Sequence, residues 1–306
     1  MNLRQLRYFL HVAELRSFTR AATVLHVAQS ALSRQIQALE EELGVTLLQR
    51  LDRGVALTEA GALFKSRVET LLEGLERARD EVSARASVPS GRLSFGLPPS
   101  MFEMVTVPLL AEYRRRYPGV LLRVTEGISA DLHQLVLAGR LDAAVVSSTE
   151  GVDRLESRLL LTEHLCLVGA RGAKLPARGE IPLERLAGLP LIVTSRPNAL
   201  RLIVEDALAC QGLPHEVAFE VNSTRVAIEL AALGAGWAVL PYCGIRDALL
   251  AQRVVAGPIR DVTVTWAFVH SRERTLSLAA AKLGELLADL AGREVRAGRW
   301  KAELAG

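Results

Sequence analysis

The sequence has few cysteines and no cysteine motif. Its three cysteines, Cys166, Cys210 and Cys243, lie far apart and form neither a CxxC pair nor a Cys/His cluster, which argues against a zinc site or a disulfide framework. We interpret Cys166, inside the apolar run LCLVGA, as buried packing rather than a redox centre, because free cysteines are usually buried. Cys210, near the end of a predicted helix, is the thiol to test with peroxide.

Long apolar runs are also absent. The longest ones, residues 189–193 and 237–240, fall far short of the roughly 20 residues that a membrane-spanning helix needs. The N-terminal residues do not form a secretory signal, because Arg4, Arg7 and Glu14 interrupt the apolar stretch. We therefore expect a cytoplasmic protein with no membrane partner.

Catalytic motifs are missing as well. The six histidines are scattered without an HExxH spacing, and no GxSxG occurs. Gly234 and Gly236 precede a predicted strand and lack the third glycine of a dinucleotide site. These absences argue against an enzyme and predict no cofactor and no metal site.

The strongest pattern that is present consists of two short helices joined by a tight turn, between Ser17 and Gly44. Ser17 can cap the first helix, and small alanines allow close helix packing. Apolar residues at helical spacing form one stripe of the second helix. Its other face begins with polar residues in the turns that reach base edges in a recognition helix, namely Gln29, Ser30, Ser33 and Arg34. A plain helical hairpin with a solvated polar face has the same periodicity.

A short hairpin with a basic tip follows. Residues 47–51 and 55–58 flank the turn that contains Arg53. Beside a recognition helix such a hairpin is a wing, and we expect Arg53 in a minor groove and Arg50 on phosphate. The net charge of the chain is only +3, but seven arginines fall in this module, at positions 4, 7, 16, 20, 34, 50 and 53.

Residues 1–61, from MNLRQLRYFL to LTEAG, closely resemble the winged helix-turn-helix of LysR-type transcriptional regulators, without a gap. The resemblance implies that Gln29, Ser30, Ser33 and Arg34 face the major groove. The chain has Ala28 and Ser30 where many family members have Ser and Pro. Loss of the capping hydroxyl at Ala28 costs about 1 kcal/mol of helix stability. Ser30 adds a hydrogen-bonding group where Pro has none, so that we expect a different base preference at that edge of the DNA half-site. The region also resembles the nitrogen assimilation control branch, where regulation need not use a small ligand.

Residues 59–82, after Thr58, are predicted to form one long helix. Its apolar stripe must be buried, either against a second copy of the chain, as in the resembled family, or on its own domain. The stripe contains Leu63, Phe64, Val68, Leu71, Leu72, Leu75, Ala78 and Val82. We favour dimerisation, because the helix connects two modules. Residues 86–91, ASVPSG, read as a hinge-like linker.

Beyond residue 91 strand-like and helical segments alternate, which favours parallel sheets with crossover helices. Expected strands are 93–97, 120–125, 143–147, 165–169, 189–194, 217–221, 237–241 and 262–269, and expected helices are 105–117, 130–138, 200–209, 225–233 and 276–290. The chain passes between two groups of strands near residues 161–163 and 266–269, which predicts two lobes around a cleft. This part resembles the effector-binding domain of the same family, itself similar to periplasmic solute-binding proteins.

The predicted fold class is therefore α/β overall, with an N-terminal winged helix-turn-helix, a long linker helix and a two-lobed effector domain. We expect a DNA-binding domain at 1–58, a dimerisation helix and hinge at 59–91 and an effector-binding domain at 92–306. Lobe I would contain 92–161 and 269–292, and lobe II 162–268.

Candidate effector residues lie where strands end and helices begin. Ser100, Ser129, Asn198 and Ser223 each follow a strand and precede a helix, so that they are either simple N-caps or part of a pocket for carboxylate or phosphate. The resemblance places Ser100 and Ser129 at effector-contacting positions. Further candidates on strand-end loops are Ser147, Ser148, Thr194, Ser195 and Arg196, with Met101 and Phe102 as an apolar wall.

We expect a sequence-specific regulator that acts as a homodimer or a dimer of dimers on an interrupted inverted repeat near a promoter. A small anionic effector and RNA polymerase are the other expected partners. A LysR-type regulator controlled by its abundance or by a protein partner is the alternative, and a solute-binding protein or an enzyme are the other classes weighed. Binding of duplex DNA separates a regulator from both classes. The sequence does not decide between activation and repression, and it assigns no function to residues 292–306.

Overall fold

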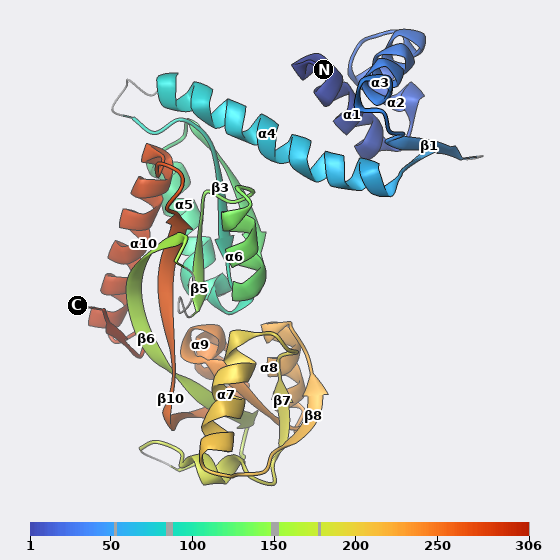
Figure 1. Cartoon of the computed structure of the whole chain (residues 1–306). Coiled ribbons are helices and arrows are strands. Elements are labelled where there is room, and N and C mark those ends of the chain that lie inside the picture. The colour runs from blue at the N-terminus through green and yellow to red at the C-terminus, as the bar shows by residue number, and fades with distance from the viewer. Residues whose placement is uncertain (52–53, 84–87, 148–152, 177–178, 306) are drawn as a thin grey trace. The chain divides into compact units, whose positions relative to one another are not determined.

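The computed structural model describes residues 1–51, 54–83, 88–147, 153–176 and 179–305, and of residues 50, 73 and 76–83 it describes only the backbone (Figure 1). The chain divides into two compact units, Met1–Arg79 and Asp80–Gly306. We call them the N-terminal and the C-terminal unit. None of the described helices is both long and apolar enough to span a membrane.

The N-terminal unit is a helical bundle with a small hairpin. Its elements are α1 (Leu3–Leu15), α2 (Phe18–Val24), α3 (Gln29–Leu43), β1 (Leu48–Leu51), β2 (Gly54–Leu57) and most of α4 (Glu59–Ser83). Asn2 and Ser17 cap α1 and α2 through hydrogen bonds from the Gln5 and Arg20 amides. Ala28, the N-cap residue of α3, makes no such side-chain bond, as the missing hydroxyl predicts.

Close backbone contacts fix the hairpin to the helices. Gly54 has a φ of +105°, and a Cβ there would lie 2.8 Å from the Arg16 carbonyl oxygen, so that only glycine fits without displacement. A Cβ on Gly61 would lie 2.0 Å from the Leu47 carbonyl oxygen. The Glu40 carboxylate accepts the Leu47 amide at 2.7 Å and thereby ties the end of α3 to the hairpin.

The apolar stripe of α4 is divided between two environments. Phe64, Val68 and Leu72 pack into the core of the N-terminal unit, with Phe64 in ring contact with Phe9. Leu71 on the same helix is 60% exposed, and Leu63 and Leu75 are also exposed. Part of the stripe is therefore buried within its own unit and part remains open to solvent.

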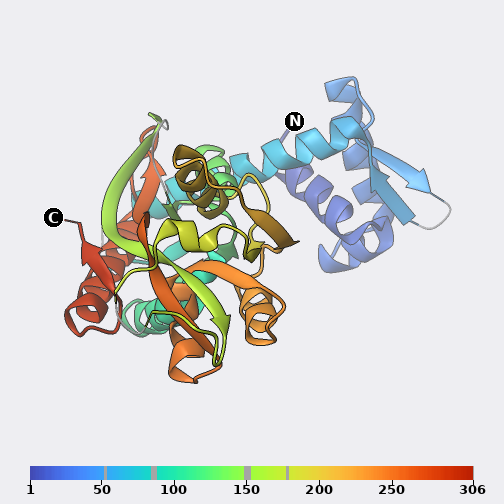
Figure 2. The same cartoon turned by 90° about the horizontal axis from the view of Figure 1, so that it is seen from below.

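The C-terminal unit is built on one twisted, mixed sheet with the strand order β4-β3-β5-β10-β6-β9-β7-β8, in which β11 also pairs with β6 (Figure 2). The strands are β3 (Gly91–Leu97), β4 (Val120–Glu126), β5 (Ala143–Ser147), β6 (Leu155–Ala170), β7 (Pro190–Val193), β8 (Glu216–Glu220), β9 (Trp237–Pro241), β10 (Val254–Ser271) and β11 (Ala302–Leu304). The helices are η1 (Pro99–Met101), η2 (Phe102–Thr106), α5 (Val107–Arg116), α6 (Ser129–Leu137), η3 (Leu183–Leu186), α7 (Ala199–Cys210), α8 (Thr224–Ala232), α9 (Tyr242–Leu250) and α10 (Leu278–Arg296).

Two long antiparallel strands, β6 and β10, run through the whole sheet and connect its two lobes. The pairs β3–β4 and β7–β8 are parallel, but β10 is antiparallel to both β5 and β6. The prediction of purely parallel sheets is therefore wrong in the middle of the sheet. β6 and β10 each extend through both lobes, and they pair antiparallel along most of their length. At the predicted crossing, Leu161 on β6 pairs with Trp266 on β10.

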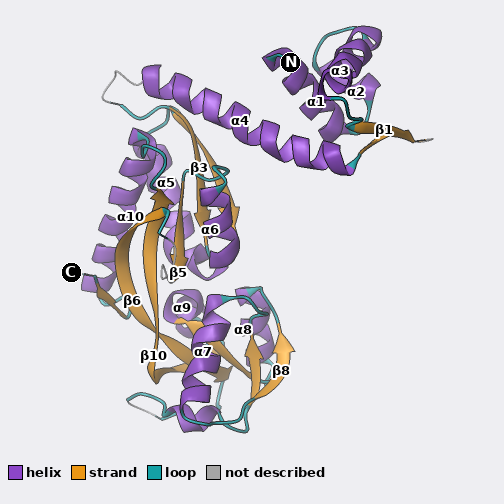
Figure 3. Cartoon of the chain, in the orientation of Figure 1, coloured by secondary structure: helices purple, strands orange, loops and turns teal. Residues whose placement is uncertain are grey.

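Helices cover both faces of the sheet, as expected for an α/β architecture (Figure 3). In lobe I, α5 and α10 pack on the face that contains Phe95 and Val145, whereas α6 packs on the face that contains Ala144 and Val146. Successive residues of a strand point to opposite faces of the sheet, so that neighbouring residues of β5 belong to two different core layers. In lobe II, α8 and α9 share a core with Val168, Ile192 and Leu240.

Helix α9 and the C-terminal strand β11 are not among the elements expected from the sequence. Trp300, just before β11, is only 2% exposed, and its indole N–H donates to Glu163 at 3.1 Å. β11 pairs with β6 so that Ala302 faces Glu163. Residues 297–304 are therefore an integral part of the C-terminal unit.

Candidate nucleic-acid interface and ligand cleft

The polar face of α3 is open to solvent, as predicted. Gln29, Ser30 and Arg34 are exposed and Ser33 is half-buried, while the opposite stripe of α3 lies in the core. The guanidinium of Arg34 donates weakly to the Ser30 carbonyl at 3.4 Å, so that it lies along the first turns of the helix. This arrangement leaves the first turns of α3 free to enter a groove.

The two arginines predicted for the wing cannot be placed with their side chains. Arg53 lies outside the described residues, and of Arg50 only the backbone in β1 is described. The hairpin itself is present, with Arg50 paired to Val55 across its two strands. The predicted linker, residues 86–91, likewise falls partly outside the described residues.

A cavity of about 620 Å³ lies between the lobes of the C-terminal unit, and we call it the cleft cavity. Lobe I contributes the turn after β3 and the end of β4, and lobe II contributes the start of α8, part of α9 and Arg253. Its lining consists of Pro99, Ser100, Phe102, Glu103, Glu126, Ser223, Thr224, Arg225, Ile228, Glu229, Gly244, Ala248 and Arg253. Its volume is in the range of pockets for small molecules.

Two of the predicted effector residues, Ser100 and Ser223, meet at this cavity. Ser223 is the N-cap of α8, and its hydroxyl accepts the Val226 amide at 3.4 Å. Ser100 is buried and lies inside the short helix η1, whose N-cap is Pro98, so that the expectation of a cap at Ser100 is wrong. Among the described residues no group meets hydrogen-bond geometry with the Ser100 hydroxyl, although the Cys243 thiol lies close to it.

The charges around the cleft cavity are mixed. Arg253 forms an ion pair with Glu229 at 2.5 Å. The neighbouring Asp247 carboxyl raises the pKa of the Glu103 carboxyl above its ordinary value, and partial burial raises it further. Arg225 also lines the cavity, and no described carboxylate lies within ion-pair distance of it. The lining thus offers one unpaired arginine together with acidic groups.

Ser129 and Ser147 form a hydrogen-bonded pair away from the lining of the cleft cavity. Their hydroxyl oxygens lie 2.8 Å apart, and the Ser147 amide donates to the Ser129 hydroxyl at 2.9 Å. The N-cap of α6 is Ile128, and Ser129 is the first helical residue, so that the expectation of a cap at Ser129 is wrong. The hydroxyl points inward because β5 supplies it with an amide donor. Ser148 lies outside the described residues.

The remaining predicted residues lie in other surroundings. Asn198 caps α7, as predicted, by accepting the Leu200 amide at 3.0 Å. Arg196 is exposed and pairs with Glu205 at 2.8 Å, and the Ser195 amide donates to the Asn222 side chain. Met101 is 1% exposed within the main core and is not an apolar wall. Phe102, half exposed, takes that position beside the cavity.

Sequence reasoning missed the charged residues of the cleft cavity. Arg225 lies two residues after the Ser223 cap, in the first turn of α8, so that a search for charged residues near predicted caps could have found it. Glu103 and Arg253 give no comparable signal, because the first lies in an irregular helix and the second follows α9, which was not predicted.

The cysteines behave as the sequence analysis suggests. Cys166 and Cys243 are buried and Cys210 is exposed, and all three are free thiols. Burial raises the pKa of Cys166 to about 12 and that of Cys243 well above its ordinary value, so that neither is a reactive thiolate at neutral pH. No group of three His, Cys, Asp or Glu side chains among the described residues could hold a metal ion.

Comparison with known families settles the identity of both units. The family model "LysR substrate binding domain" matches residues 86–292, and "Bacterial regulatory helix-turn-helix protein, lysR family" matches residues 3–62. The chain belongs to the LysR family of transcriptional regulators. As a LysR-family protein it is a DNA-binding regulator with a substrate-binding domain, and it is not an enzyme. The resemblance on which the sequence analysis relied is confirmed.

Individual relatives extend over nearly the whole of this LysR-family chain. It is 34% identical to the transcriptional regulator BbuR of Bordetella bronchiseptica, over 96% of this chain and 91% of that protein. It is 33% identical to the nitrogen assimilation regulatory protein nac of Klebsiella aerogenes, over 96% of both chains. The similarity to the nitrogen assimilation branch is therefore confirmed.

A solved structure shares the fold of this LysR-family chain. Full-length CbnR, in a complex with its target DNA, matches with a TM-score of 0.72 over 96% of this chain and 99% of that chain, at 24% identity. The likeness confirms the predicted fold class, in which an N-terminal helix-turn-helix and a linker helix precede a mixed α/β domain.

Proposed function

We propose that this LysR-family regulator binds an interrupted inverted repeat as a homodimer or a dimer of dimers, and that a small metabolite in the cleft cavity modulates its activity. The observation that carries the effector part is the cavity of about 620 Å³, to which both lobes contribute side chains. A ligand that contacts both lobes changes their arrangement only if it binds one arrangement more tightly than the other. A ligand that contacts both lobes can have such a difference in affinity, because its contacts change when the arrangement of the lobes changes.

The chemistry of the cleft cavity favours a metabolite with a carboxylate. Arg225 lies at the start of α8, where the helix dipole and the first amides also attract an anion. The buried Ser100 hydroxyl offers a further polar contact. Glu103 and Glu126 on the lobe I side match an ammonium group, so that an amino acid or a related zwitterion fits the mixed charge better than a simple dianion.

The proposed DNA contacts rest on the exposed first turns of α3. Gln29, Ser30, Ser33 and Arg34 would read base edges in a major groove. Arg50 and Arg53 of the hairpin would hold phosphate and enter the minor groove. Support comes from the solvent exposure of the α3 residues and from the fold shared with a regulator solved on its target DNA.

The proposed dimer rests on the open part of the α4 stripe. Leu63 and Leu71 are exposed by 63% and 60%, and a second α4 would remove both from water. Two modules joined in this way would match the two halves of an inverted repeat. RNA polymerase is the expected further partner of the DNA-bound assembly.

The dimer is tested with Leu71→Glu in the full-length protein. A charge on the shared face should halve the mass measured by light scattering and weaken binding to an inverted-repeat duplex. The matched control is Leu121→Glu on β4, since Leu121 is 62% exposed outside α4. An unchanged mass for the Leu71 variant would remove α4 from the dimer interface.

The effector is tested by thermal unfolding of the full-length protein with a panel of amino acids, small organic acids and aromatic metabolites. A ligand at about a hundred times its dissociation constant adds roughly 2.7 kcal/mol to the free energy of unfolding. Arg225→Ala should abolish the shift, whereas Arg185→Ala, an exposed arginine outside the cavity lining, should preserve it.

The outcome also separates the two modes of regulation. A shift with one chemical class names the signal. If no compound shifts the midpoint but duplex DNA still binds, the effector part fails, and control by abundance or by a protein partner takes its place.

A further inference from the structure

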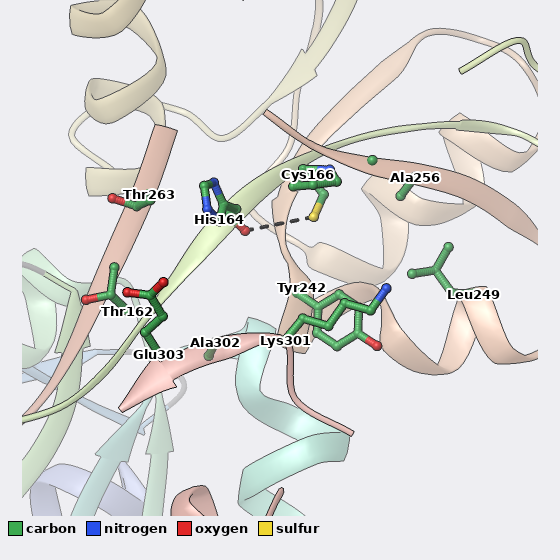
Figure 4. A pocket seen from close by; sticks show the side chains of 12 residues that line it. Thr162, His164, Cys166, Tyr242, Leu249, Ala256, Thr263, Lys301, Ala302 and Glu303 are labelled. Atoms are coloured by element: carbon green, nitrogen blue, oxygen red, sulfur yellow. Dashed lines mark hydrogen bonds between the residues drawn. The ribbon is translucent and has the colours of Figure 1, made fainter. Parts of the chain in front are cut away.

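A second pocket of about 320 Å³ lies on the two long strands, where the C-terminal segment crosses them (Figure 4). We call it the tail pocket. It shares no lining residue with the cleft cavity. Its floor comes from β6 and β10, one wall from α9, and the other wall from the C-terminal segment around β11.

Strand alternation explains how the sequence builds this pocket. Thr162, His164 and Cys166 lie on one face of β6 and line the pocket, while the residues between them, Glu163 and Leu165, are buried on the other face. β11 follows the same rule, because Glu303 pairs with Thr162 and lines the pocket. The tail thus points Trp300 into the core and its charged neighbours toward the pocket.

One end of the pocket is polar, and the other is apolar apart from the Lys301 ammonium. Figure 4 shows Lys301, Tyr242 and Leu249 together at one end and Thr162, Thr263 and Glu303 at the other. At the apolar end, Cys166 is 5% exposed and neutral at ordinary pH, since burial raises its pKa to about 12. Ala256 and Pro258 add further apolar surface.

The polar groups of β6 in the pocket already have partners within the chain. Thr162 bonds to the Thr265 hydroxyl at 2.9 Å, and the His164 ring bonds to the Ile259 carbonyl at 3.1 Å. The Lys301 ammonium differs, because it lies 5.4 Å from the centre of the Tyr242 ring and no described carboxylate is within ion-pair distance of it. One available cation therefore stands at the rim of an apolar floor.

We propose that the tail pocket binds a small amphiphilic monocarboxylate, a medium-chain or aryl-substituted acid, as a second ligand site. The apolar body lies over Cys166, Ala256 and Leu249, and the carboxylate faces Lys301. The volume is near the lower end of ligand pockets, which suits a molecule of this size. A ligand seated there contacts both long strands, α9 and the tail at once.

The test is calorimetric titration of the full-length protein with octanoate and 3-phenylpropionate, and with octanamide as the neutral analogue. We expect saturable binding of at least one of the two acids, one molecule per chain. Lys301→Gln should weaken binding of that acid about fivefold, since a partly exposed ion pair contributes little more. Lys282→Gln, at a partly exposed lysine of α10 outside the pocket, is the control and should leave the binding of the acid unchanged.

A second variant tests the apolar floor independently of charge. Ala256→Leu fills part of the pocket and should abolish binding, while thermal unfolding checks that the variant is folded. Three results overturn the proposal: no saturable binding of either acid, binding that survives Ala256→Leu, or octanamide binding as tightly as octanoate. Arg225→Ala in the cleft cavity should leave the titration unchanged, so that failure here is distinct from failure of the proposed effector site.

Discussion

The polar residues singled out in the two units have opposite surroundings. On α3 of the N-terminal unit, Gln29, Ser30 and Arg34 face solvent opposite a buried stripe. In the C-terminal unit, Ser129 and Ser147 bond to each other inside the protein. The periodicity of one amphipathic helix tells which side chains point outward. At a strand end, whether a side chain points inward or outward depends on neighbours that are distant in sequence. The partner of Ser129, for example, is Ser147, 18 residues later.

The largest effect on stability is expected at Glu163, a buried polar residue of the C-terminal unit. Its carboxylate accepts hydrogen bonds from the Trp266 indole at 2.6 Å, the Cys243 amide at 2.9 Å and the Trp300 indole. Glu163→Ala leaves three buried donors without an acceptor and should lower the free energy of unfolding by about 3–5 kcal/mol, measured by urea denaturation. A loss below about 1 kcal/mol would mean that water replaces the carboxylate without difficulty.

The same residue predicts a dependence on pH. Burial raises the pKa of the Glu163 carboxyl, while its hydrogen bonds oppose the shift in part. A raised pKa in the folded state makes stability greatest below the ordinary glutamate pKa, and stability is lost as pH rises through the raised value. Wild-type protein should therefore lose stability relative to Glu163→Gln as pH increases above about 4.5. Parallel curves for the two proteins in urea titrations would contradict this.

Ser129→Ala comes next in size. It removes the acceptor of the Ser147 amide and the partner of the Ser147 hydroxyl, which should cost about 1–3 kcal/mol in the free energy of unfolding. Chemical denaturation measures the loss. Weaker ligand response in this variant would not by itself place Ser129 in the effector site, because the fold changes as well.

Ser100→Ala is the matched comparison in the same unit. The Ser100 hydroxyl is buried beside the cleft cavity and meets no described partner in hydrogen-bond geometry, so that its removal should change the free energy of unfolding by less than about 1 kcal/mol. A reduced thermal shift with ligand, at unchanged stability, would support Ser100 as a direct contact. A strong destabilisation would show instead that the hydroxyl holds η1 in place.

Arg34→Ala should have the smallest effect on stability and a large effect on binding. An exposed side chain on α3 typically contributes within about 0.5 kcal/mol to folding. Loss of a base contact costs roughly 1–3 kcal/mol and relaxes specificity at one base pair. Footprinting and mobility shift measure both, with Arg67→Ala, an exposed arginine of α4, as the control. An unchanged footprint would exclude Arg34 from the reading set.

Local patterns were sufficient for most elements, and long-range pairing was the point at which prediction failed. Spacing of apolar residues located α3 and most strands. The full length of β6 and β10 was missed, because polar residues interrupt the apolar pattern on both faces, Glu163 on one and Thr162 and Thr265 on the other. The burial of Glu163 is explained only by its hydrogen bonds from Trp266 and Trp300, which lie 103 and 137 residues away in the sequence.

In mechanical terms, β6 and β10 form a continuous antiparallel ladder through the C-terminal unit, and this ladder is irregular at two positions. β6 and β10 pair without a loop between the lobes, and the register shifts only between Pro258 and Thr263 and between Trp266 and Ala267. Bulges bend strands, so that deformation concentrates at these two positions. The stretch between them carries Glu163 opposite Val264 and is held by the C-terminal strand. Movement of the two lobes relative to each other should therefore be small, and it should be limited by the stiffness of β6 and β10 at these two register shifts.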